Sequence, residues 1–282
     1  MTHKPHGARR NNLLMERVGL IAGSGSFPLL FADEVRRLGY AVVAIAHTGE
    51  TLPILESKVD KIFWIRVGQL GRLISVLKRE GITRAVMAGA IKKSRFFTNI
   101  RPDLRAIRIL RQLKERKDDF VLRAVADELE KEGIAIEGAT KYVPSLLAAP
   151  GVLSRRAPRQ QEWGDLEFGF RVGREIARSG VGQCIVVKRR AVLAVEAIEG
   201  TDRTILRGGR FAKGAIVIKV CKPQQDLRFD LPTVGPRTIE VMLEAGAGCL
   251  GIEVGKTVIL ERAAMFAQAD AAGIAIVGLD GV

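Results

Sequence analysis

The sequence predicts an α/β protein with two α/β domains and a ligand cleft between them. The first domain is expected to be Rossmann-like with a mostly parallel sheet, and the second to be a mixed α/β domain. Three observations support this prediction. The chain has 282 residues, about the length of two domains. Short apolar runs alternate with amphipathic segments, and a glycine-rich loop follows the first of these runs.

Four apolar runs in the first half predict buried strands, and helical patterns separate them. The expected strands are 18–22, 41–46, 62–67 and 85–88, and the expected helices are 28–38 and 70–80. Pro28 suits the first position of its helix, where a missing N–H group breaks no hydrogen bond. Strands that alternate with helices favour parallel pairing, with helices on both faces of the sheet.

The alternation continues through the rest of the chain. The expected helices are 103–117, 118–132, 163–178, a short one after Glu199, 236–245 and 262–271, and the expected strands are 134–136, 184–188, 191–197, 215–220 and 274–277. Two further strands, 249–254 and 257–260, are predicted to form a hairpin-like pair. Residues 1–16 show little periodicity and predict a disordered basic extension. We therefore expect one domain at 17–140 and a second at 141–282.

Composition argues against several functional classes. The 45 Lys+Arg against 31 Asp+Glu give a formal net charge of +14, spread along the chain without a long block of like charge. Such a charge attracts anionic ligands and surfaces, but aromatic residues are only 5% of the chain, so we expect no nucleic-acid partner. The three cysteines lack Cys-x-x-Cys spacing, which predicts neither a disulfide framework nor a zinc site and favours the cytoplasm. Only His47 lies outside the N-terminal extension, too few histidines for a histidine-rich metal centre.

The first candidate binding site is the loop after the first expected strand, with Gly23, Ser24 and Gly25 as binding residues. A glycine-rich turn that leads into a helix exposes backbone N–H groups, and the helix dipole favours a phosphate there. Pro28 replaces the third glycine of a dinucleotide fingerprint, and the second strand ends at His47 and not at an acidic residue, which disfavours a nicotinamide cofactor. The structural alternative is a tight turn that needs glycines for steric reasons alone.

Two further loops follow predicted strands and are expected at the same edge of the sheet. Gln69 is a candidate for hydrogen bonding to a base or sugar, although capping its helix is the favoured alternative. Gly89 and Lys92 follow the fourth strand, and Lys92 is a candidate phosphate ligand or a solvated lysine.

The densest polar segment is 222–235, which places two carboxylates, two cations and two glutamines between prolines. Lys222, Gln225 and Arg228 are candidate phosphate ligands, and Asp230 is the candidate catalytic carboxylate. Apolar residues alternate with these charges, which favours a half-buried site over a solvated loop. A second, acidic group contains Glu196, Glu199 and Asp202; Glu199 and Asp202 are candidate Mg²⁺ ligands beside Asp230, and Thr201 is a candidate substrate contact. The equal alternative is that Thr201 or Asp202 caps a helix and that Glu196 is a charge on a strand face.

These motifs together resemble a known family, the LpxI-type UDP-2,3-diacylglucosamine pyrophosphatases of lipid A synthesis. The matching segments are VGLIAGSGSFP at 18–28, VGQLG at 67–71, AVMAGAIKK at 85–93, KDDFVLRAV at 117–125, VEAIEGTD at 195–202 and KPQQDLRFDLPTVGP at 222–236. The last two are long and specific, and the resemblance covers nearly all of residues 17–278.

The resemblance implies a hydrolase that cleaves UDP-2,3-diacylglucosamine with Mg²⁺ and releases UMP and 2,3-diacylglucosamine 1-phosphate. It implies that the aspartate of the DLPT segment, here Asp230, is essential for turnover. It also implies a homodimer in the cytoplasm or peripheral on the anionic inner membrane. The basic helix expected at 103–117 suits such a surface, although a solvated face is the favoured interpretation. The alternative function is a non-catalytic protein that binds a sugar nucleotide or anionic lipid.

Overall fold

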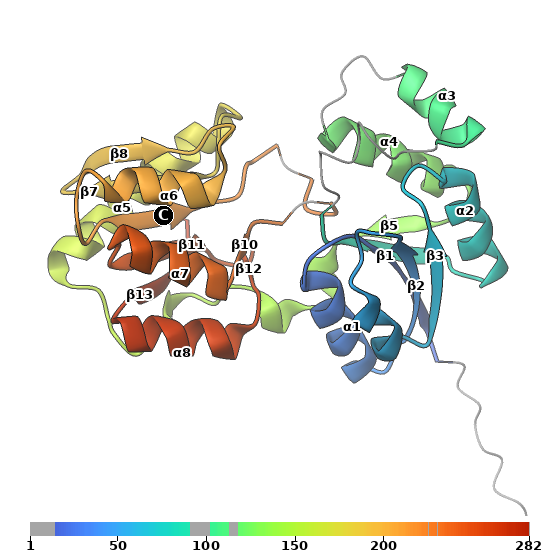
Figure 1. Cartoon of the computed structure of the whole chain (residues 1–282), viewed down its shortest axis with the longest axis horizontal. Coiled ribbons are helices and arrows are strands. Elements are labelled where there is room, and N and C mark those ends of the chain that lie inside the picture. The colour runs from blue at the N-terminus through green and yellow to red at the C-terminus, as the bar shows by residue number, and fades with distance from the viewer. Residues whose placement is uncertain (1–14, 91–101, 113–117, 225, 230, 282) are drawn as a thin grey trace, which may run out of the picture.

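We analysed a computed structural model, which describes residues 15–90, 102–112, 118–224, 226–229 and 231–281. Two α/β units lie side by side, one formed by the first half of the chain and the other by the second (Figure 1). The α/β class predicted from the alternation of apolar runs and helices is confirmed.

The first unit is built on a five-stranded sheet in which every neighbouring pair is parallel, in the order β3-β2-β1-β4-β5. Its strands are β1 (Arg17–Ala22), β2 (Ala41–His47), β3 (Lys61–Ile65), β4 (Arg84–Ala88) and β5 (Ala135–Glu137). This is the strand order of a Rossmann fold, in which ligands bind at the carboxyl ends of the strands where the order reverses. That point lies here between β1 and β4.

Helices cover both faces of this sheet, and alternate residues of each strand face opposite sides. Val18 and Leu20 of β1 pack under α1 (Phe27–Arg37) and η1 (Pro53–Lys58). Ile21 packs on the other face with α2 (Leu70–Arg79), α3 (Leu104–Gln112) and α4 (Asp118–Lys131). Both faces are buried, and continuous apolar strands such as 18–22 are typical of that environment.

The second unit is built on a six-stranded mixed sheet in the order β6-β13-β11-β9-β7-β8. Its strands are β6 (Gly151–Val152), β7 (Cys184–Lys188), β8 (Ala191–Val195), β9 (Ile216–Lys219), β11 (Cys249–Glu253) and β13 (Ala275–Leu279). The central strands β9, β11 and β13 are parallel, whereas β6, β7 and β8 pair antiparallel with their neighbours. The predicted mixed character of the second domain is confirmed.

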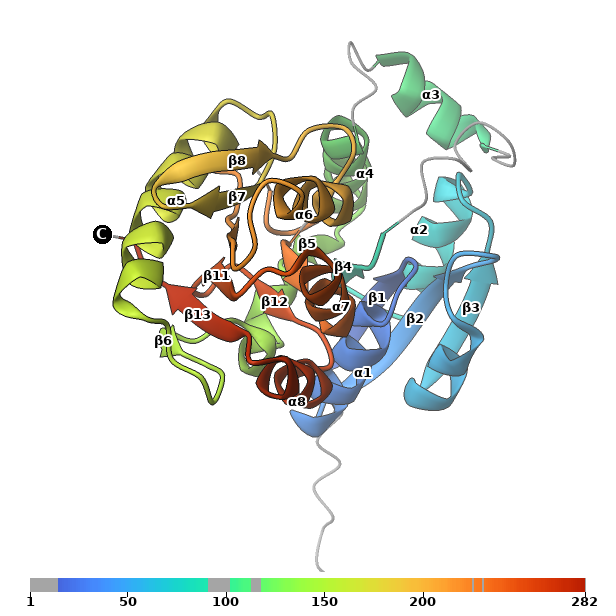
Figure 2. The same ribbon diagram turned by 60° about the vertical axis from the view of Figure 1, so that its left-hand side comes forward.

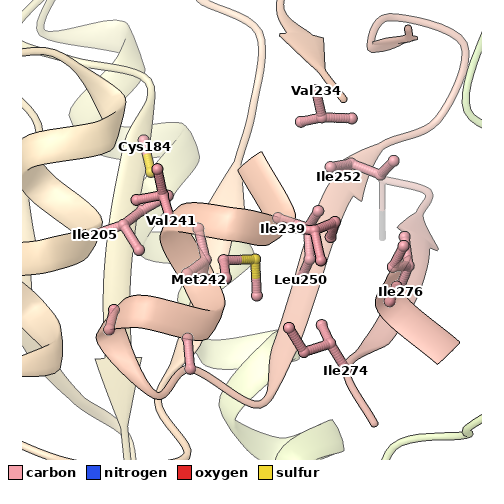
Figure 3. Packing of buried hydrophobic residues seen from close by; sticks show 14 of the residues in the cluster. Cys184, Ile205, Val234, Ile239, Val241, Met242, Leu250, Ile252, Ile274 and Ile276 are labelled. Carbon is pink, nitrogen blue, oxygen red and sulfur yellow. The ribbon is translucent and has the colours of Figure 1, made fainter. Parts of the chain in front are cut away.

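One helix packs on one face of this sheet and three on the other. The single helix is α5 (Gln160–Arg178), and the three are α6 (Thr201–Gly209), α7 (Pro236–Ala245) and α8 (Arg262–Ala272). Figure 3 shows the core under the three helices, where Ile239 and Met242 of α7 pack against Leu250 and Ile252 of β11. Burial of these apolar side chains stabilises the second unit.

The expected hairpin at 249–260 is wrong. β11 pairs in parallel with β9 and β13 inside the large sheet. β12 (Val258–Ile259) instead pairs in parallel with β10 (Thr233–Val234) in a separate two-stranded sheet. Two adjacent apolar runs joined by Gly255 look like a hairpin in the sequence. The backbone hydrogen bonds on both edges of β11 are instead made with β9 and β13. The described part of the helix expected at 103–117 ends at Gln112, and residues 113–117 lie outside the described ranges.

The segment around β10 and β12 joins the two units. Val258, Leu231 and Leu260 belong to the apolar cluster that also contains Phe27 of α1 and Tyr142 of the segment that connects the units. Figure 1 shows β12 on the side of the second unit that faces the first, and Figure 2 shows the same strand in a view turned by 60°. Short 3₁₀ helices, η3 (Ala139–Lys141) and η4 (Pro144–Leu146), carry the chain from one unit to the other. No helix of the described residues has the length and apolar character of a membrane span.

Candidate functional site

A cleft of about 510 Å³ lies between the two halves of the chain. The first half contributes the carboxyl ends of β1, β2 and β4 and the start of α1, together with two residues of α4. The second half contributes Leu260 and five residues of the segment 227–233. The cleft therefore joins the two segments that sequence analysis singled out separately, at the point where the strand order of the first sheet reverses.

The β1–α1 loop presents backbone N–H groups to this cleft. Gly25, Ser26 and Phe27 all line it, and no described residue accepts a hydrogen bond from their N–H groups. Gly25 and Ser26 precede α1 and Phe27 is its first residue, at the end where the helix dipole places partial positive charge. Gly25 has φ +89°, a left-handed conformation that glycine adopts without strain. The loop is thus arranged to bind an anionic oxygen.

Gly23 and Gly89 have a different role, which is steric. The loops after β1 and β4 pack together through hydrogen bonds between Ser24 and Ala90, including one from the Ser24 hydroxyl to the Ala90 carbonyl at 2.8 Å. A Cβ atom on Gly23 would lie 2.6 Å from the Ala90 oxygen, and one on Gly89 would lie 2.5 Å from the Ser24 oxygen. The glycines at positions 23 and 89 are therefore explained by close packing of the two loops. The N–H groups without acceptors belong to the residues that follow Gly23, which are Gly25, Ser26 and Phe27.

His47 ends β2 and lines the same cleft, although only 5% of the residue is exposed. Its Nδ1 lies 2.9 Å from the carbonyl oxygen of Ala22, and its backbone N–H donates to the hydroxyl of Thr51. The Thr51 hydroxyl donates in turn to Ala22. Burial lowers the pKa of His47, opposed by the Ala22 hydrogen bond and by the nearby charge of Glu50. The ring is therefore neutral at physiological pH.

Arg228 is the one predicted phosphate ligand of segment 222–235 found among the described cleft residues. Its guanidinium hydrogen bonds to both oxygens of Asp226 and pairs with Glu130 of α4 at 2.9 Å. The Asp226 hydrogen bond raises the pKa of Arg228, and Arg228 lowers the pKa of Asp226. The ion pair to Glu130 ties this segment to the first unit, so Arg228 holds the cleft together and also faces it.

The other predicted binding residues are placed less favourably. Asp230, Gln225 and Lys92 lie outside the described residues, although Phe229 and Leu231 on either side of Asp230 line the cleft. Gln69, Thr201 and Lys222 are not among the described residues that line it. Gln69 is the N-cap residue of α2, but its side chain makes no capping hydrogen bond and accepts the N–H of Arg66, which lies before the helix.

The carboxylates proposed as Mg²⁺ ligands are engaged elsewhere. Glu199 binds Arg207 and the N–H of Ala197, and hydrogen bonds from its own N–H and from Arg207 lower its pKa. Asp202 pairs with Arg237 at 3.4 Å. Among the described residues no three His, Cys, Asp or Glu side chains come together as metal ligands. The described carboxylates alone therefore do not form a Mg²⁺ centre.

Sequence analysis missed two features of the cleft. His47 was used only to argue against a metal centre and a nicotinamide cofactor, although its place at the end of the second strand marks it as a ligand contact in a Rossmann-type sheet. The apolar wall was missed because its residues come from distant segments: Ile21, Phe27, Met87, Val121, Leu122, Leu227, Phe229, Leu231 and Leu260. Periodicity assigns such residues to the core and does not separate a cleft wall from it.

Both halves of the chain match domains of a known protein family. Residues 17–146 match the LpxI N-terminal domain, and residues 149–277 match the LpxI C-terminal domain. The UDP-2,3-diacylglucosamine pyrophosphatase LpxI of Caulobacter vibrioides is 33% identical over 279 residues, which cover 94% of this chain and 98% of that protein.

Two solved structures match parts of the chain at low sequence identity and low TM-score. Pyruvate carboxylase T882A of Rhizobium etli, with acetyl coenzyme A, matches 71% of this chain and 18% of its own, at 13% identity and a TM-score of 0.29. The match to the glycinamide-RNase-transformylase T of Mycobacterium tuberculosis covers 65% of this chain and 44% of that protein, at 16% identity and a TM-score of 0.25. Matches over both domains and nearly the full length of a relative show that the chain belongs to the LpxI family.

Proposed function

We propose that the chain hydrolyses the pyrophosphate bond of UDP-2,3-diacylglucosamine and releases UMP and 2,3-diacylglucosamine 1-phosphate. The observation that carries this proposal is the cleft, which joins the phosphate-type loop after β1 to segment 222–235. The family resemblance implies that the essential aspartate lies in that segment. The 33% identity to a relative named for this activity supports the choice of substrate.

The residues divide the work according to their chemistry. Backbone N–H groups of Gly25, Ser26 and Phe27 bind phosphate oxygens of the nucleotide. The apolar wall, which includes Met87, Leu122 and Phe229, packs against the acylated sugar and excludes water from all but the attacked bond.

Water adds across the anhydride, so that one phosphorus gains the new oxygen and the other leaves with the bridging oxygen. Asp230 is assigned to this step from the resemblance, as the carboxylate that takes the proton of the attacking water or holds a metal ion. A free aspartate is a weak base at neutral pH, so a base role requires a neighbourhood that raises its pKa.

Magnesium dependence is part of the proposal through the family resemblance. A bound Mg²⁺ would neutralise charge on the diphosphate, and it commonly uses one or two carboxylates together with substrate phosphates. The arginine pairs of Glu199 and Asp202 leave those two poorly suited to it. We therefore derive no step through the metal.

Association with an anionic inner-membrane surface, a homodimer and a cytoplasmic location stay predictions from the resemblance. One described feature supports the membrane partner. On α3, Arg108 and Arg111 are exposed beside Leu104, whose exposed fraction is 85%. A helix with exposed cations and an exposed leucine suits the headgroup region of an anionic bilayer.

The test is phosphorus NMR of purified protein with UDP-2,3-diacylglucosamine, with Mg²⁺ or with EDTA. We expect UMP and the sugar 1-phosphate in equal amounts from the wild type, and little of either with EDTA. Asp230→Asn is isosteric and removes the negative charge, so we expect turnover to fall by on the order of 10³-fold or more while nucleotide binding remains.

The control for Asp230→Asn is Asp280→Asn, a change at an exposed carboxylate outside the cleft. Unchanged turnover in a folded Asp230→Asn variant would remove the assignment of that residue. Saturable binding of the substrate with no product at any Mg²⁺ concentration would replace the enzyme by the alternative, a non-catalytic sugar-nucleotide-binding protein.

A further inference from the structure

The imidazole of His47 has one nitrogen that the described structure uses and one that it does not. Nδ1 faces the carbonyl oxygen of Ala22 at 2.9 Å. A carbonyl oxygen only accepts hydrogen bonds, so Nδ1 must carry the proton. In the neutral ring Nε2 then has a lone pair and acts as an acceptor.

The ring is held in place by its neighbours. The backbone N–H of His47 donates to the Thr51 hydroxyl at 2.9 Å, and that hydroxyl donates to the same Ala22 oxygen at 2.7 Å. These bonds connect the ends of β1 and β2, whose residues pair in register up to Ala22 and Ala46. The imidazole is therefore pre-organised before any ligand binds.

Nε2 has no hydrogen-bond partner among the described residues, and His47 lines the cleft. An acceptor at this position needs a donor from the ligand. Phosphate oxygens at neutral pH offer none, and the acylated sugar of the proposed substrate offers its own hydroxyl groups and an amide N–H. A nucleotide offers the ribose hydroxyls and the N3–H group of uracil.

The position of His47 in the sheet favours the ribose. In Rossmann folds the phosphate lies on the first strand–helix loop, and the residue that ends the second strand binds a ribose hydroxyl, where it is an acidic acceptor. In this chain the loop of Gly25 and Ser26 corresponds to the phosphate position, and His47 stands where the acidic residue would be. A neutral imidazole with a protonated Nδ1 is also an acceptor there.

We propose that Nε2 of His47 accepts a hydrogen bond from a ribose hydroxyl of the bound nucleotide and so selects ribonucleotides over deoxyribonucleotides. The inference rests on the proposed function, since it takes the ligand to be a uridine nucleotide. His47 is a specificity-determining residue in this assignment and takes no part in the bond cleavage.

Two substitutions separate the two nitrogens. His47→Asn keeps an N–H donor near the position of Nδ1, within reach of Ala22, but has no acceptor at the position of Nε2. His47→Gln places an amide oxygen near the position of Nε2. Isothermal titration calorimetry measures the binding of UMP, 2′-deoxy-UMP, 3′-deoxy-UMP and N3-methyl-UMP to each protein, and circular dichroism confirms that each is folded.

We expect the wild type to prefer UMP over one of the two deoxy analogues by about 3- to 10-fold, the value of one hydrogen bond. His47→Asn should bind UMP and that analogue equally, and His47→Gln should keep the preference. A preference that persists in His47→Asn, or that is absent from the wild type, overturns the inference. A change in discrimination only against N3-methyl-UMP also overturns it, because the base would then be the donor.

Turnover of UDP-2,3-diacylglucosamine by the same preparations separates this inference from the proposed function. If the wild type releases no UMP but His47→Asn loses the ribose preference, the proposed hydrolysis fails and the role of His47 stands. If turnover is normal and the preference is unaffected by His47→Asn, the role of His47 fails and the hydrolysis stands.

Discussion

The polar residues of the two halves are used in opposite ways. In the first half, Gly25, Ser26 and Phe27 line a cleft, and their N–H groups have no acceptor among the described residues. In the second half, Glu199 and Asp202 are held by Arg207 and Arg237. These two carboxylates, which look like metal ligands in the sequence, are paired with arginines of their own domain.

The exception is the segment around Arg228, whose residues line the cleft together with residues of the first unit. Its ion pair with Glu130 and the packing of Phe229 beside the apolar cluster of α2 and α4 attach it there. A dense polar segment in the sequence therefore indicates a binding site only where the fold places its residues in a cleft. The predictions below test this difference, beginning with the largest expected effect.

Substitution of Gly23 by alanine tests whether the first half depends on close packing of two loops. The added Cβ would lie 2.6 Å from a backbone oxygen of the β4 loop, which is unable to move without breaking the Ser24–Ala90 bonds. We expect turnover to be lost and the free energy of unfolding to fall by about 1–3 kcal/mol, as for other overpacked sites.

The matched control for Gly23→Ala is Gly39→Ala, at a left-handed turn with nothing within 4 Å of the added carbon. It should lose about 1 kcal/mol of stability with turnover unchanged. Urea unfolding and the NMR assay measure both quantities. Normal turnover in Gly23→Ala would show that the loop tolerates displacement and is not a shaped binding site.

The pH dependence of stability tests the burial of His47. Burial lowers its pKa in the folded chain, so between the ordinary value near 6.5 and the lower folded value only the unfolded chain takes up the proton. Stability is therefore expected to fall as the pH drops below about 6.5, by at most about 1.4 kcal/mol per pH unit.

His47→Asn should remove this slope, because the two other histidines of the chain, His3 and His6, lie in the N-terminal extension. Urea unfolding at pH 8, 7, 6 and 5.5 measures it for both proteins. The same slope in His47→Asn as in the wild type would mean that another group carries the titration.

The smallest effects are expected for the acidic pair of the second half. We expect Glu199→Gln and Asp202→Asn each to keep kcat/KM within about three-fold of the wild type, whereas loss of a metal ligand or its support costs 10- to 100-fold. A fall of that larger size, together with a raised Mg²⁺ requirement, would show that the arginine pairs open and that both halves supply catalytic carboxylates.

Much of the fold was predictable because strands and helices follow local hydrophobic patterns. The run 18–22 is apolar on both sides of the strand, which is why it was recognisable as a buried parallel strand. The incorrect hairpin at 249–260 had an equally clear local pattern. Which strand pairs with which depends on contacts between segments far apart in sequence, and local periodicity carries no information about them.

The candidate site was predictable only in part for the same reason. Gly23, Gly25 and Gly89 follow strands, so their place at a sheet edge could be inferred. The Arg228–Glu130 pair could not, because it joins residues 98 positions apart, and the apolar wall could not, because its residues come from segments between Ile21 and Leu260.

By itself the sequence determined the α/β class, the positions of most strands and helices, the family resemblance and the kinds of chemistry available, because each depends on residue type and local spacing. The tertiary structure decided which polar groups face a ligand and which only neutralise one another. Charge and hydrogen-bonding capacity are properties of a residue, whereas whether they remain available depends on the partners that folding places within about 3 Å.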